Sequence, residues 1–426
     1  MRFENTADYA LRLDQEDPLR HYREEFHFPQ VKGKDVIYFT GNSLGLQPKS
    51  AQRFVDDIMK DWRELAVEGH FYAEKPWWDY HERLAPALAR IVGARIREVS
   101  VMNTLTVNLH LLMVSFYRPH GKRYKILCEE KAFPSDQYML QSQLKFHGYD
   151  PGEALIEVRK RPGEHHWRTE DILQAIESHR GELALVLMGG VNYYNGQVLD
   201  MAAITKAGKA AGAMVGWDLA HAAGNVHLAL HDWEVDFASW CSYKYMNSGP
   251  GNASGIFVHE KHQADPDIPR FEGWWGTKRE TRFLMQPRFD PIESADAWQV
   301  SNPPVLALAP YLASLELFEQ AGMDALIAKR DRIVAYLEFV LGEVDRQVES
   351  TFEIITPPGA RGCQLSVFLH GEGRPLFDYL MQNGVITDWR EPNVIRLAPA
   401  PFYCSYTDMY RFGEILKQGI LERTGA

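Results

Sequence analysis

Short apolar segments alternate with helix-like segments through the middle of this chain, and this order restricts the possible folds more than any other feature. The strand-like runs include "YKILCEE", "LALVLMGG" and "MVGWD", and between them lie helix-like runs such as "FPSDQYMLQSQLKFHG" and "MAAITKAGKAAGA". Short apolar strands that are joined through helices run parallel, and the helices then cover both faces of the sheet. The sequence therefore predicts an α/β fold with a mostly parallel central sheet.

A different pattern begins near Pro304, where two long segments have apolar residues at helical spacing. After the turn at residues 357–359 follow a strand, a helix, a second strand and a last helix. This order predicts a smaller α+β domain at the C-terminus. We therefore expect an N-terminal segment at residues 1–50 that packs near the domain junction, a large domain at 51–304 and a small domain at 305–426.

Charge and cysteine content argue against several classes of protein. The formal net charge is 46 − 57 = −11 and no basic block occurs, so we expect neither nucleic acid nor an anionic membrane surface as a partner. The four cysteines form no CxxC pair, so neither a disulfide scaffold nor a thiolate zinc site is indicated. The N-terminus is charged and no apolar run of about 18 residues occurs, so we expect no signal peptide and no membrane span. The resulting expectation is a cytoplasmic protein.

Polar or aromatic residues follow the apolar runs at four places. Thr106 lies where the helix-like run "LTVNLHLLM" begins, and Phe133 precedes a Pro-Ser-Asp helix start. Asp218 and His221 end a buried strand, and Lys244 follows another strand between two tyrosines. In an open α/β sheet, ligands bind beyond the carboxyl ends of the strands, so these residues are candidates for one site.

Each place also has a purely structural interpretation. Thr104, Ser135 and Asp136 are good helix-capping residues, and Asp218 could equally cap a helix that follows its strand. Lys244 could be a solvent-exposed side chain, as most lysines are. It stands, however, between mainly apolar or small residues and the turn at residues 249–251, which is an unusual place for a surface lysine.

Together the four places supply what pyridoxal phosphate requires. This cofactor needs a lysine amine for a Schiff base, a carboxylate that keeps its ring nitrogen protonated, a helix N-terminus for its phosphate and an aromatic face for its ring. Lys244, Asp218, Thr106 and Phe133 would meet these requirements in turn. A carboxylate beside the ring nitrogen stabilises its positive charge, which makes the ring an electron sink. The sequence therefore predicts a pyridoxal-phosphate enzyme.

Six segments resemble the kynureninase family, in the family's order and along nearly the whole chain. They are "YFTGNSLGLQPK", "MNTLTVNLHLLM", "KAFPSDQY", "DLAHAAGNV", "HDWEVDFASWCSYKYMNSGPG" and "VSNPPVL". The resemblance implies the type I fold of pyridoxal-phosphate-dependent transferases, with a mostly parallel seven-stranded sheet flanked by helices and a small α+β C-terminal domain. It also implies a homodimer with shared active sites, and a hydrolase that acts on a small amino-acid substrate.

The resemblance also assigns roles to individual residues. Lys244 would carry the cofactor, and Asp218 would pair with its ring nitrogen, with His221 supporting that region. Trp274 and Asn302 would reach the cofactor from the neighbouring subunit. The other residues that the family places around the cofactor are Leu105, Thr106, Phe133, Ser135, Asp136 and Tyr243.

The stretch "GNSLGLQP" at residues 41–48 would present backbone N–H groups to an anion, because glycine lets the backbone approach closely and the following helix adds its positive end. It lacks the Gly-Lys-Ser/Thr ending of a nucleotide-binding loop, which argues against a triphosphate. The resemblance places Gly41, Asn42 and Ser43 beneath the substrate's α-carboxylate, with Arg396 forming a bidentate pair. One departure is Gly189, which stands where many relatives carry serine, so one hydroxyl contact to the phosphate would be missing or replaced.

The reaction that the resemblance implies is hydrolysis of the Cβ–Cγ bond of L-kynurenine or 3-hydroxy-L-kynurenine, which gives anthranilate or 3-hydroxyanthranilate and L-alanine. Lys244 is then the base that removes the Cα proton, and Tyr243 is the candidate for moving a proton at the γ-carbonyl or Cβ. His70, Ser301 and Asn302 match in type the residues of relatives that favour the 3-hydroxy substrate. Polar groups that bond a ring hydroxyl reject an analogue without it, so we expect this preference here, although His70 could equally be a solvated histidine.

Three other functions remain open from the sequence. Another pyridoxal-phosphate enzyme of this fold, such as a cysteine desulfurase, would need an exposed nucleophilic cysteine, but Cys363 begins an apolar strand and should be buried and inert. A metal hydrolase would use His227 and His231, whose spacing in "HLALH" puts both imidazoles on one helical face, but the Glu of HExxH and a nearby third ligand are missing. A non-catalytic binding relative would have no need of Lys244. We therefore expect no metal in the catalytic site.

Overall fold

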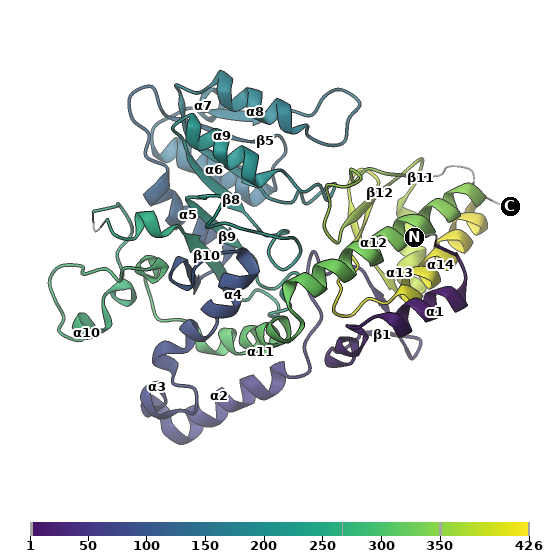
Figure 1. The fold of residues 1–426 in the computed structure, drawn as a ribbon, viewed down its shortest axis with the longest axis horizontal. Coiled ribbons are helices and arrows are strands. Elements are labelled where there is room, and N and C mark those ends of the chain that lie inside the picture. The colour runs from purple at the N-terminus through teal and green to yellow at the C-terminus, as the bar shows by residue number, and fades with distance from the viewer. Residues whose placement is uncertain (1–2, 266, 349–351, 425–426) are drawn as a thin grey trace.

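The computed structural model describes residues 3–265, 267–348 and 352–424. Its main feature is a seven-stranded sheet (Figure 1). In spatial order its strands are β4 (Val99–Met102), β10 (Ser254–Val258), β9 (Phe237–Trp240), β8 (Met214–Asp218), β7 (Leu183–Gly189), β5 (Lys125–Glu129) and β6 (Leu155–Val158). Each neighbouring pair from β9 to β6 is parallel, whereas β10 runs antiparallel to both of its neighbours. The predicted α/β fold with a mostly parallel sheet is confirmed.

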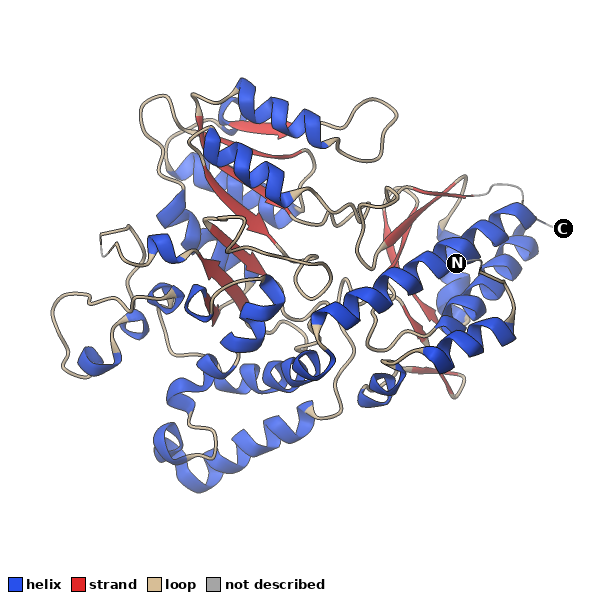
Figure 2. Ribbon diagram, in the orientation of Figure 1, coloured by secondary structure: helices blue, strands red, loops and turns tan. Residues whose placement is uncertain are grey.

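Helices cover both faces of this sheet, as Figure 2 shows. They include α5 (Leu105–Phe116), α6 (Pro134–Phe146), α8 (Thr169–Ser178) and α9 (Met201–Ala210). Along β7, Leu185 and Leu187 join the apolar core beneath α5 and α6, whereas Val186 and Met188 join the core beneath α8 and α9. A strand buried on both faces has apolar residues at successive positions, which explains the continuous run "LALVLM".

A four-stranded antiparallel sheet lies on the right in Figure 1. Its strands, in spatial order, are β11 (Phe352–Ile354), β12 (Leu365–Leu369), β15 (Val394–Leu397) and β14 (Asp388–Arg390). The helices of this half are α1 (Ala7–Glu16), α12 (Met323–Gln347), α13 (Arg374–Gln382) and α14 (Tyr406–Thr424). α1 packs on α14, and β3 (Ile37–Tyr38) pairs with β13 (Val385–Ile386), so N-terminal residues complete the C-terminal half.

Two further helices, α2 (Ala51–Leu65) and α11 (Val305–Ala321), pack against each other beside the large sheet. The remaining short elements are α3 (Gly69–Tyr72), α4 (Ala85–Val92), α7 (Pro151–Ala154), α10 (Arg279–Arg282), β1 (Gln30–Val31) and β2 (Lys34–Asp35). The division at residues 50 and 304 stays a prediction. Across the described residues, no helix combines the length and the apolar composition that a membrane span requires.

Candidate active site

A cavity of about 500 Å³ lies at the carboxyl ends of the parallel strands, with walls from both sheets. Three neighbouring strands end in its wall, at Glu129 of β5, Gly189 of β7 and Asp218 of β8. Gly189 and Asp218 are direct partners in the register of β7 and β8. This is the edge at which open α/β sheets bind ligands.

Lys244 lines this cavity and is only 9% exposed. Its Nζ lies 5.9 Å from the centre of the Phe133 ring, and Phe133 immediately precedes α6. Phe133 itself is 39% exposed and packs edge to face against Tyr193. The interpretation of Lys244 as a surface lysine is therefore wrong, because the turn after β9 places the residue in the cavity wall.

Three buried carboxyl groups, those of Glu129, Asp136 and Asp218, share the cavity. Burial and the charge of Asp218 raise the pKa of Asp136 well above its usual range. Burial also raises the pKa of Glu129 to about 7, although the Gly189 N–H donates to Glu129 Oε1 at 3.2 Å and favours the charged form. Because buried carboxylates repel one another, this wall of the cavity favours a cationic ligand group.

Two further candidates, His221 and Tyr243, lie beside Lys244 in the wall. Burial and the charge of Lys244 lower the pKa of His221 well below its usual range, so the imidazole is neutral. Burial and the neighbouring thiol of Cys241 raise the pKa of Tyr243, so its hydroxyl keeps its proton at neutral pH.

The start of α5 forms another part of the wall through Thr104, Leu105 and Thr106. The Thr104 side chain makes no capping hydrogen bond, and neither α5 nor α6 has a side-chain cap, so capping does not explain Thr104, Ser135 or Asp136. The first N–H groups of a helix have no partner within the helix and suit a phosphate.

The interpretation of Asp218 as a helix cap is wrong, because the described residues between β8 and β9 include no helix; Asp218 Oδ1 instead accepts the N–H of Ala220 in a turn, at 2.6 Å. The same carboxylate lines the cavity.

The stretch at residues 41–48 reaches the cavity through Asn42 and Ser43. Asn42 is fully buried, and its Nδ2 donates to Gln364 Oε1 at 2.9 Å, which fixes the loop to the segment before β12. The prediction that the following helix adds its positive end to this site is wrong, because α2 begins only at Ala51, outside the cavity wall.

Arg396 enters the cavity from β15 and is almost fully buried. Its Nη1 donates to the carbonyl oxygen of Tyr193 at 2.6 Å, its Nη2 pairs with Asp388, and its Nε has no hydrogen-bond partner. Arg390 lines the same cavity and donates to Asp388 at 3.2 Å. The four-stranded sheet thus contributes two guanidinium groups, whereas the large sheet contributes carboxyl groups.

Four predicted residues do not line the Lys244 cavity of their own chain, namely His70, Trp274, Ser301 and Asn302. Trp274 Nε1 donates to Asn302 Oδ1 at 3.1 Å, so these two residues stay together. The rings that connect His70 with Trp274 are those of Phe71, Trp78 and Trp275. The structure therefore separates the predicted site residues into two sets: one lines the Lys244 cavity, and the other lies outside it, beside the group of aromatic rings just described.

The cavity residues that were missed from the sequence include Glu129, Tyr193 and Arg390. Glu129 ends the strand-like run "YKILCE", which is the same signal that pointed to Asp218, so it could have been found. Tyr193 lies in the loop after β7 and Arg390 ends a three-residue strand, and no apolar run marks either position.

The cavity residues fit pyridoxal phosphate. A protonated ring nitrogen beside Asp218 would relieve the repulsion that raises the pKa of Asp136. Asp136 Oδ1 and His221 Nδ1 are buried without a hydrogen-bond partner, so both have capacity for a ligand. Lys244 and Phe133 supply the amine and the aromatic face in one wall.

Comparison with known proteins agrees with this geometry. Residues 87–350 match the aminotransferase class-V family, and residues 330–416 match the kynureninase C-terminal domain. The chain is 70% identical over 423 residues to a kynureninase of Flavobacterium johnsoniae, which covers 99% of this chain and 100% of that relative. The chain belongs to the kynureninase family. A kynureninase of Christiangramia forsetii is 70% identical over 425 residues, with 99% and 100% covered, and one of Myxococcus xanthus is 54% identical over 418 residues, with 97% of each chain covered.

Solved structures of low sequence identity share the fold. The cysteine desulfurase CsdA of Escherichia coli superimposes with a TM-score of 0.76 at 13% identity, over 95% of this chain and 98% of that chain. The cystine C–S lyase C-DES gives a TM-score of 0.75 at 16% identity, over 89% and 97%. The predicted type I fold, the predicted cofactor pyridoxal phosphate and the predicted class of pyridoxal-phosphate-dependent hydrolase are confirmed by membership of the kynureninase family.

The alternatives can now be compared with the structure. Cys363 is fully buried, as predicted, and burial raises the pKa of its thiol to about 12, which disfavours the thiolate that a nucleophile requires. The prediction that His227 and His231 share a helical face is wrong, because this segment is not helical. Leu228 and Leu230 between them are both buried, whereas His227 is exposed, which is the alternation of an extended chain.

Proposed function

We propose that the protein is a kynureninase, which hydrolyses the Cβ–Cγ bond of L-kynurenine or 3-hydroxy-L-kynurenine and releases anthranilate or 3-hydroxyanthranilate and L-alanine. The observation that carries this proposal is that Lys244, Asp218 and Arg396 meet in one cavity of a chain 70% identical to relatives named kynureninase. An amine and a carboxylate serve the cofactor, and an arginine serves the carboxylate of an amino acid. Four free, buried cysteines suit a reducing compartment, so we also propose a cytoplasmic location.

Arg396 binds the α-carboxylate of the substrate. The Tyr193 carbonyl and Asp388 hold two guanidinium nitrogens, so the side chain is oriented before the substrate arrives. The free Nε and the remaining N–H groups of the fork are then available for a carboxylate. Asn42 and Ser43 close the cavity on this side.

Lys244 is the base that removes the Cα proton. Pyridoxal phosphate, when bound, supplies an electron sink for the bonds that break at the substrate. Asp218 would keep the proton on the ring nitrogen, because an adjacent carboxylate favours the charged form. The neutral His221 fills the region beside Asp218 without adding a competing positive charge.

Tyr243 donates a proton at the γ-carbonyl oxygen or at Cβ. Its raised pKa keeps the hydroxyl protonated, as a proton donor requires at neutral pH. The reaction consumes one water molecule: its hydroxyl group joins Cγ and becomes part of the product carboxylate, and a proton joins Cβ to form the methyl group of alanine.

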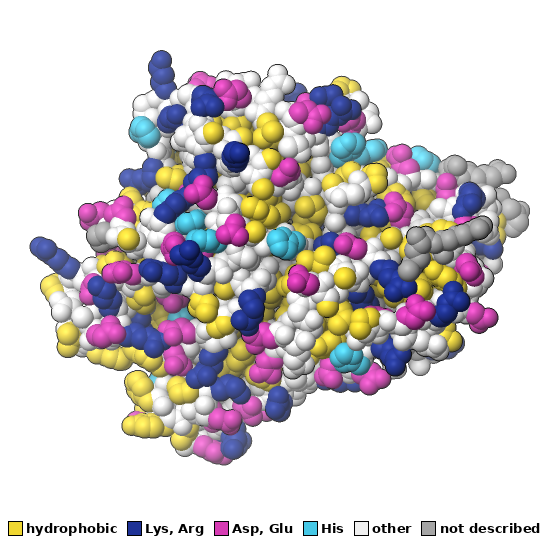
Figure 3. Space-filling model, viewed as in Figure 1, with side chains coloured by type: hydrophobic (Ala, Val, Ile, Leu, Met, Phe, Trp, Pro, Cys, Tyr) yellow, Lys and Arg dark blue, Asp and Glu magenta, His cyan; other side chains and the backbone are white. Residues whose placement is uncertain are grey.

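The second half of the site comes from another copy of the chain. Hydrophobic side chains gather at the lower left of the face in Figure 3, over the region of α10 and α3. The large hydrophobic side chains exposed in and near α2, α3 and α10 include Trp62, Phe71, Tyr72, Trp274, Phe283, Leu284 and Met285. Apolar surfaces of this kind mark protein contacts. A two-fold dimer would bring Trp274, Asn302 and His70 to the partner's Lys244 cavity.

The 3-hydroxy substrate is the preferred one. Asn302 and Ser301 are exposed in the single chain, so a dimer could place them beside the aromatic ring of the substrate. His70 packs edge to face against the ring of Trp77, within the aromatic region that also contains Trp274. A polar group that loses its partner on binding the unsubstituted ring disfavours that substrate, by about 1–3 kcal/mol.

The first experiment compares product formation from kynurenine and 3-hydroxykynurenine by the purified protein with pyridoxal phosphate. We expect activity with both, a higher kcat/KM for the hydroxylated substrate, and no activity in Lys244→Ala. His70→Ala and Asn302→Ala should each reduce the preference for the hydroxylated substrate, measured as kcat/KM for 3-hydroxykynurenine divided by kcat/KM for kynurenine. An unchanged ratio in both variants would contradict the proposed basis of the preference, and no activity with either substrate would contradict the proposed function.

A mixed-dimer experiment tests the shared site. Lys244→Ala and Asn302→Ala chains, each of low activity, are combined and allowed to exchange subunits. If Asn302 serves the partner's cavity, a mixed dimer has one intact site of two, so random mixing restores about one quarter of wild-type activity. If Asn302 serves its own chain's cavity, mixing restores nothing, and the proposed shared site is refuted.

A further inference from the structure

A compact cluster lies at the end of the large sheet's strands opposite to the Lys244 cavity, and it consists of Glu98, His231 and His259. Glu98 immediately precedes β4, and His259 immediately follows β10. Val258 pairs with Phe237, the first residue of β9, so the end of β10 lies beside the start of the parallel strands. The Lys244 cavity lies at the other ends of those strands. The kynureninase reaction proposed above makes no use of this cluster.

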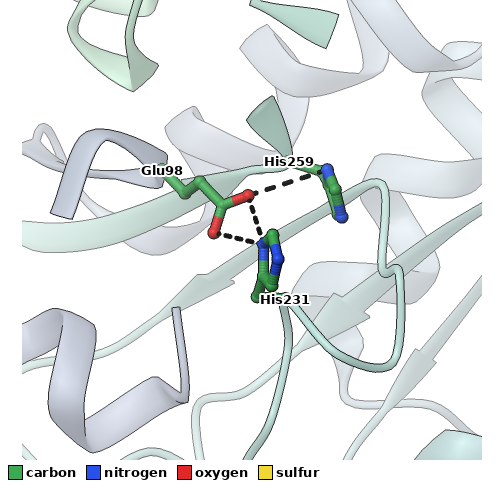
Figure 4. A group of neighbouring side chains, drawn as sticks. All are labelled: Glu98, His231 and His259. Atoms are coloured by element: carbon green, nitrogen blue, oxygen red, sulfur yellow. Dashed lines mark hydrogen bonds and ion pairs between the residues drawn. The ribbon is translucent and has the colours of Figure 1, made fainter. Parts of the chain in front are cut away.

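The three side chains point toward a common centre, as Figure 4 shows. His231 Nδ1 lies 2.9 Å from Glu98 Oε1 and 3.1 Å from Oε2, and His259 Nδ1 lies 3.6 Å from Oε1. The two imidazole rings are nearly parallel, with 5.0 Å between their centres. One nitrogen of each histidine and one oxygen of Glu98 all lie within 4.8 Å of one another.

The carboxylate of this cluster is held rigidly. Glu98 is fully buried, and the backbone N–H groups of Arg95 and Glu260 donate to its two oxygens at 2.8 and 2.9 Å. His259 is buried as well, whereas His231 remains partly exposed. The side of His231 therefore offers a route from solvent to a centre whose other two donors are fixed.

We propose that Glu98, His231 and His259 bind a divalent transition-metal ion, with Zn²⁺ as the best fit. Two imidazole nitrogens and one carboxylate oxygen are a donor set that Zn²⁺ accepts, with a fourth position left for water. Ligands at about 2.0–2.2 Å from a tetrahedral ion lie about 3.3–3.6 Å apart. The distance between His259 Nδ1 and Glu98 Oε1 is 3.6 Å, so this pair is already correctly spaced. The other pair, His231 Nδ1 and Glu98 Oε1, must open from 2.9 Å by a few tenths of an ångström.

Two hydrogen bonds would be exchanged for metal bonds. The proton that His231 Nδ1 shares with Glu98 leaves as the ion binds. The hydrogen bond from the backbone N–H of Lys261 to His259 Nδ1, with 3.2 Å between the two nitrogens, is broken as well. Nearby cations do not compete for the carboxylate, since Arg95 pairs with Glu260 and Lys261 pairs with Asp236. The competing interpretation is that the cluster is only a hydrogen-bonded cap for the chain before β4, and the experiment below separates the two.

The experiment uses the holoenzyme without a histidine tag, freed of metal with a chelator and titrated with Co²⁺ as a spectroscopic substitute for Zn²⁺. We expect one equivalent of Co²⁺ per chain with an intense visible absorption band, displaced by Zn²⁺. His231→Ala and His259→Ala should weaken Co²⁺ binding by more than the roughly 10- to 100-fold that loss of an outer-shell partner costs. His227→Ala is the matched control, because His227 is exposed four positions earlier on the same segment.

Turnover of kynurenine by each variant serves as the check of folding, because the cluster and the catalytic cavity lie at opposite edges of the sheet. His231→Gln provides a second variant that keeps a polar side chain if alanine proves unstable. Absence of a Co²⁺ band in the wild-type holoenzyme would overturn the proposal. An equal Co²⁺ affinity in wild type and both histidine variants would also overturn it, since the ion would then occupy another place, such as the cofactor phosphate.

Discussion

Replacing Gly45 with alanine would place a side chain in the closest contact between residues 41–48 and the Lys244 segment. The Gly45 N–H donates to the Tyr243 carbonyl at 2.8 Å, so the two segments are held backbone to backbone. A Cβ at Gly45 would lie 2.1 Å from Asn247 Oδ1 and 2.5 Å from the carbonyl oxygen of Lys244. The Asn247 side chain can rotate away, but the Lys244 carbonyl cannot, so one of the two segments must move.

Such overpacking costs about 1–3 kcal/mol of the free energy of unfolding. Gly45 is not in the left-handed region, so this cost comes from the contact and not from backbone strain. The same displacement moves Lys244 relative to Asp218, and a shift of about 1 Å at a reacting group costs up to about 100-fold in rate. We therefore expect Gly45→Ala to lower both stability and kcat.

Urea denaturation of the holoenzyme and steady-state kinetics with kynurenine measure the two effects. Gly181→Ala is the matched control, because a Cβ there meets nothing within 4 Å and its φ is not positive. We expect the control to change the free energy of unfolding by less than about 0.5 kcal/mol and to leave kcat unchanged. If Gly45→Ala matches Gly181→Ala in both measurements, the contact is looser than the structure indicates and the reasoning fails.

Three further predictions concern the cavity. Tyr243→Phe should lower kcat by about 10²- to 10⁴-fold while the visible absorption of bound cofactor persists, because only a proton donor is lost; an unchanged kcat would assign the proton to another group. Arg396→Lys should raise KM about 10- to 100-fold with a smaller effect on kcat, since lysine cannot form the bidentate pair, and initial rates against substrate concentration measure this. In the protein stripped of cofactor, burial raises the pKa of Glu129 from 4.5 to about 7. The folded state then favours the protonated carboxyl, so the free energy of unfolding should fall by up to about 3 kcal/mol between about pH 5 and pH 8, and by less in Glu129→Gln. Urea denaturation at several pH values measures this fall, and an equal fall in both proteins would contradict the prediction.

Residues that end apolar runs were the most predictable part of the site. Asp218 and Lys244 each follow a strand buried on both faces, and parallel strands bring their carboxyl ends to one edge. The same rule applies to Glu129, which ends β5 but was not among the predicted residues. Arg396 was found only through the family resemblance, because nothing in the local pattern of β15 shows that it faces a second sheet.

The remaining differences arise where tertiary contacts decide. "HLALH" satisfies a helical spacing, but the N–H groups of Leu230 and His231 donate to the carbonyl oxygens of Val92 and Gly93 at the end of α4, and the segment forms no helix. His231 then meets Glu98 and His259, residues 133 and 28 positions away, and no pattern in the sequence marks such a meeting. The candidate metal ligands around His231 therefore come from distant parts of the sequence, and His227 is not among them.

The buried carboxyl groups link the stability of the fold to its cofactor. Burial and the charge of Asp218 raise the pKa of Asp136 well above its usual range, and burial raises the pKa of Glu129 to about 7, although Lys244 lines the same cavity. A protonated ring nitrogen held by Asp218 would remove part of the repulsion between these carboxyl groups, and the N–H groups at the start of α5 would hold the phosphate. The cavity is therefore arranged so that the two charged ends of the cofactor meet opposite environments, and the free energy released on binding should increase as pH rises and the carboxyl groups ionise.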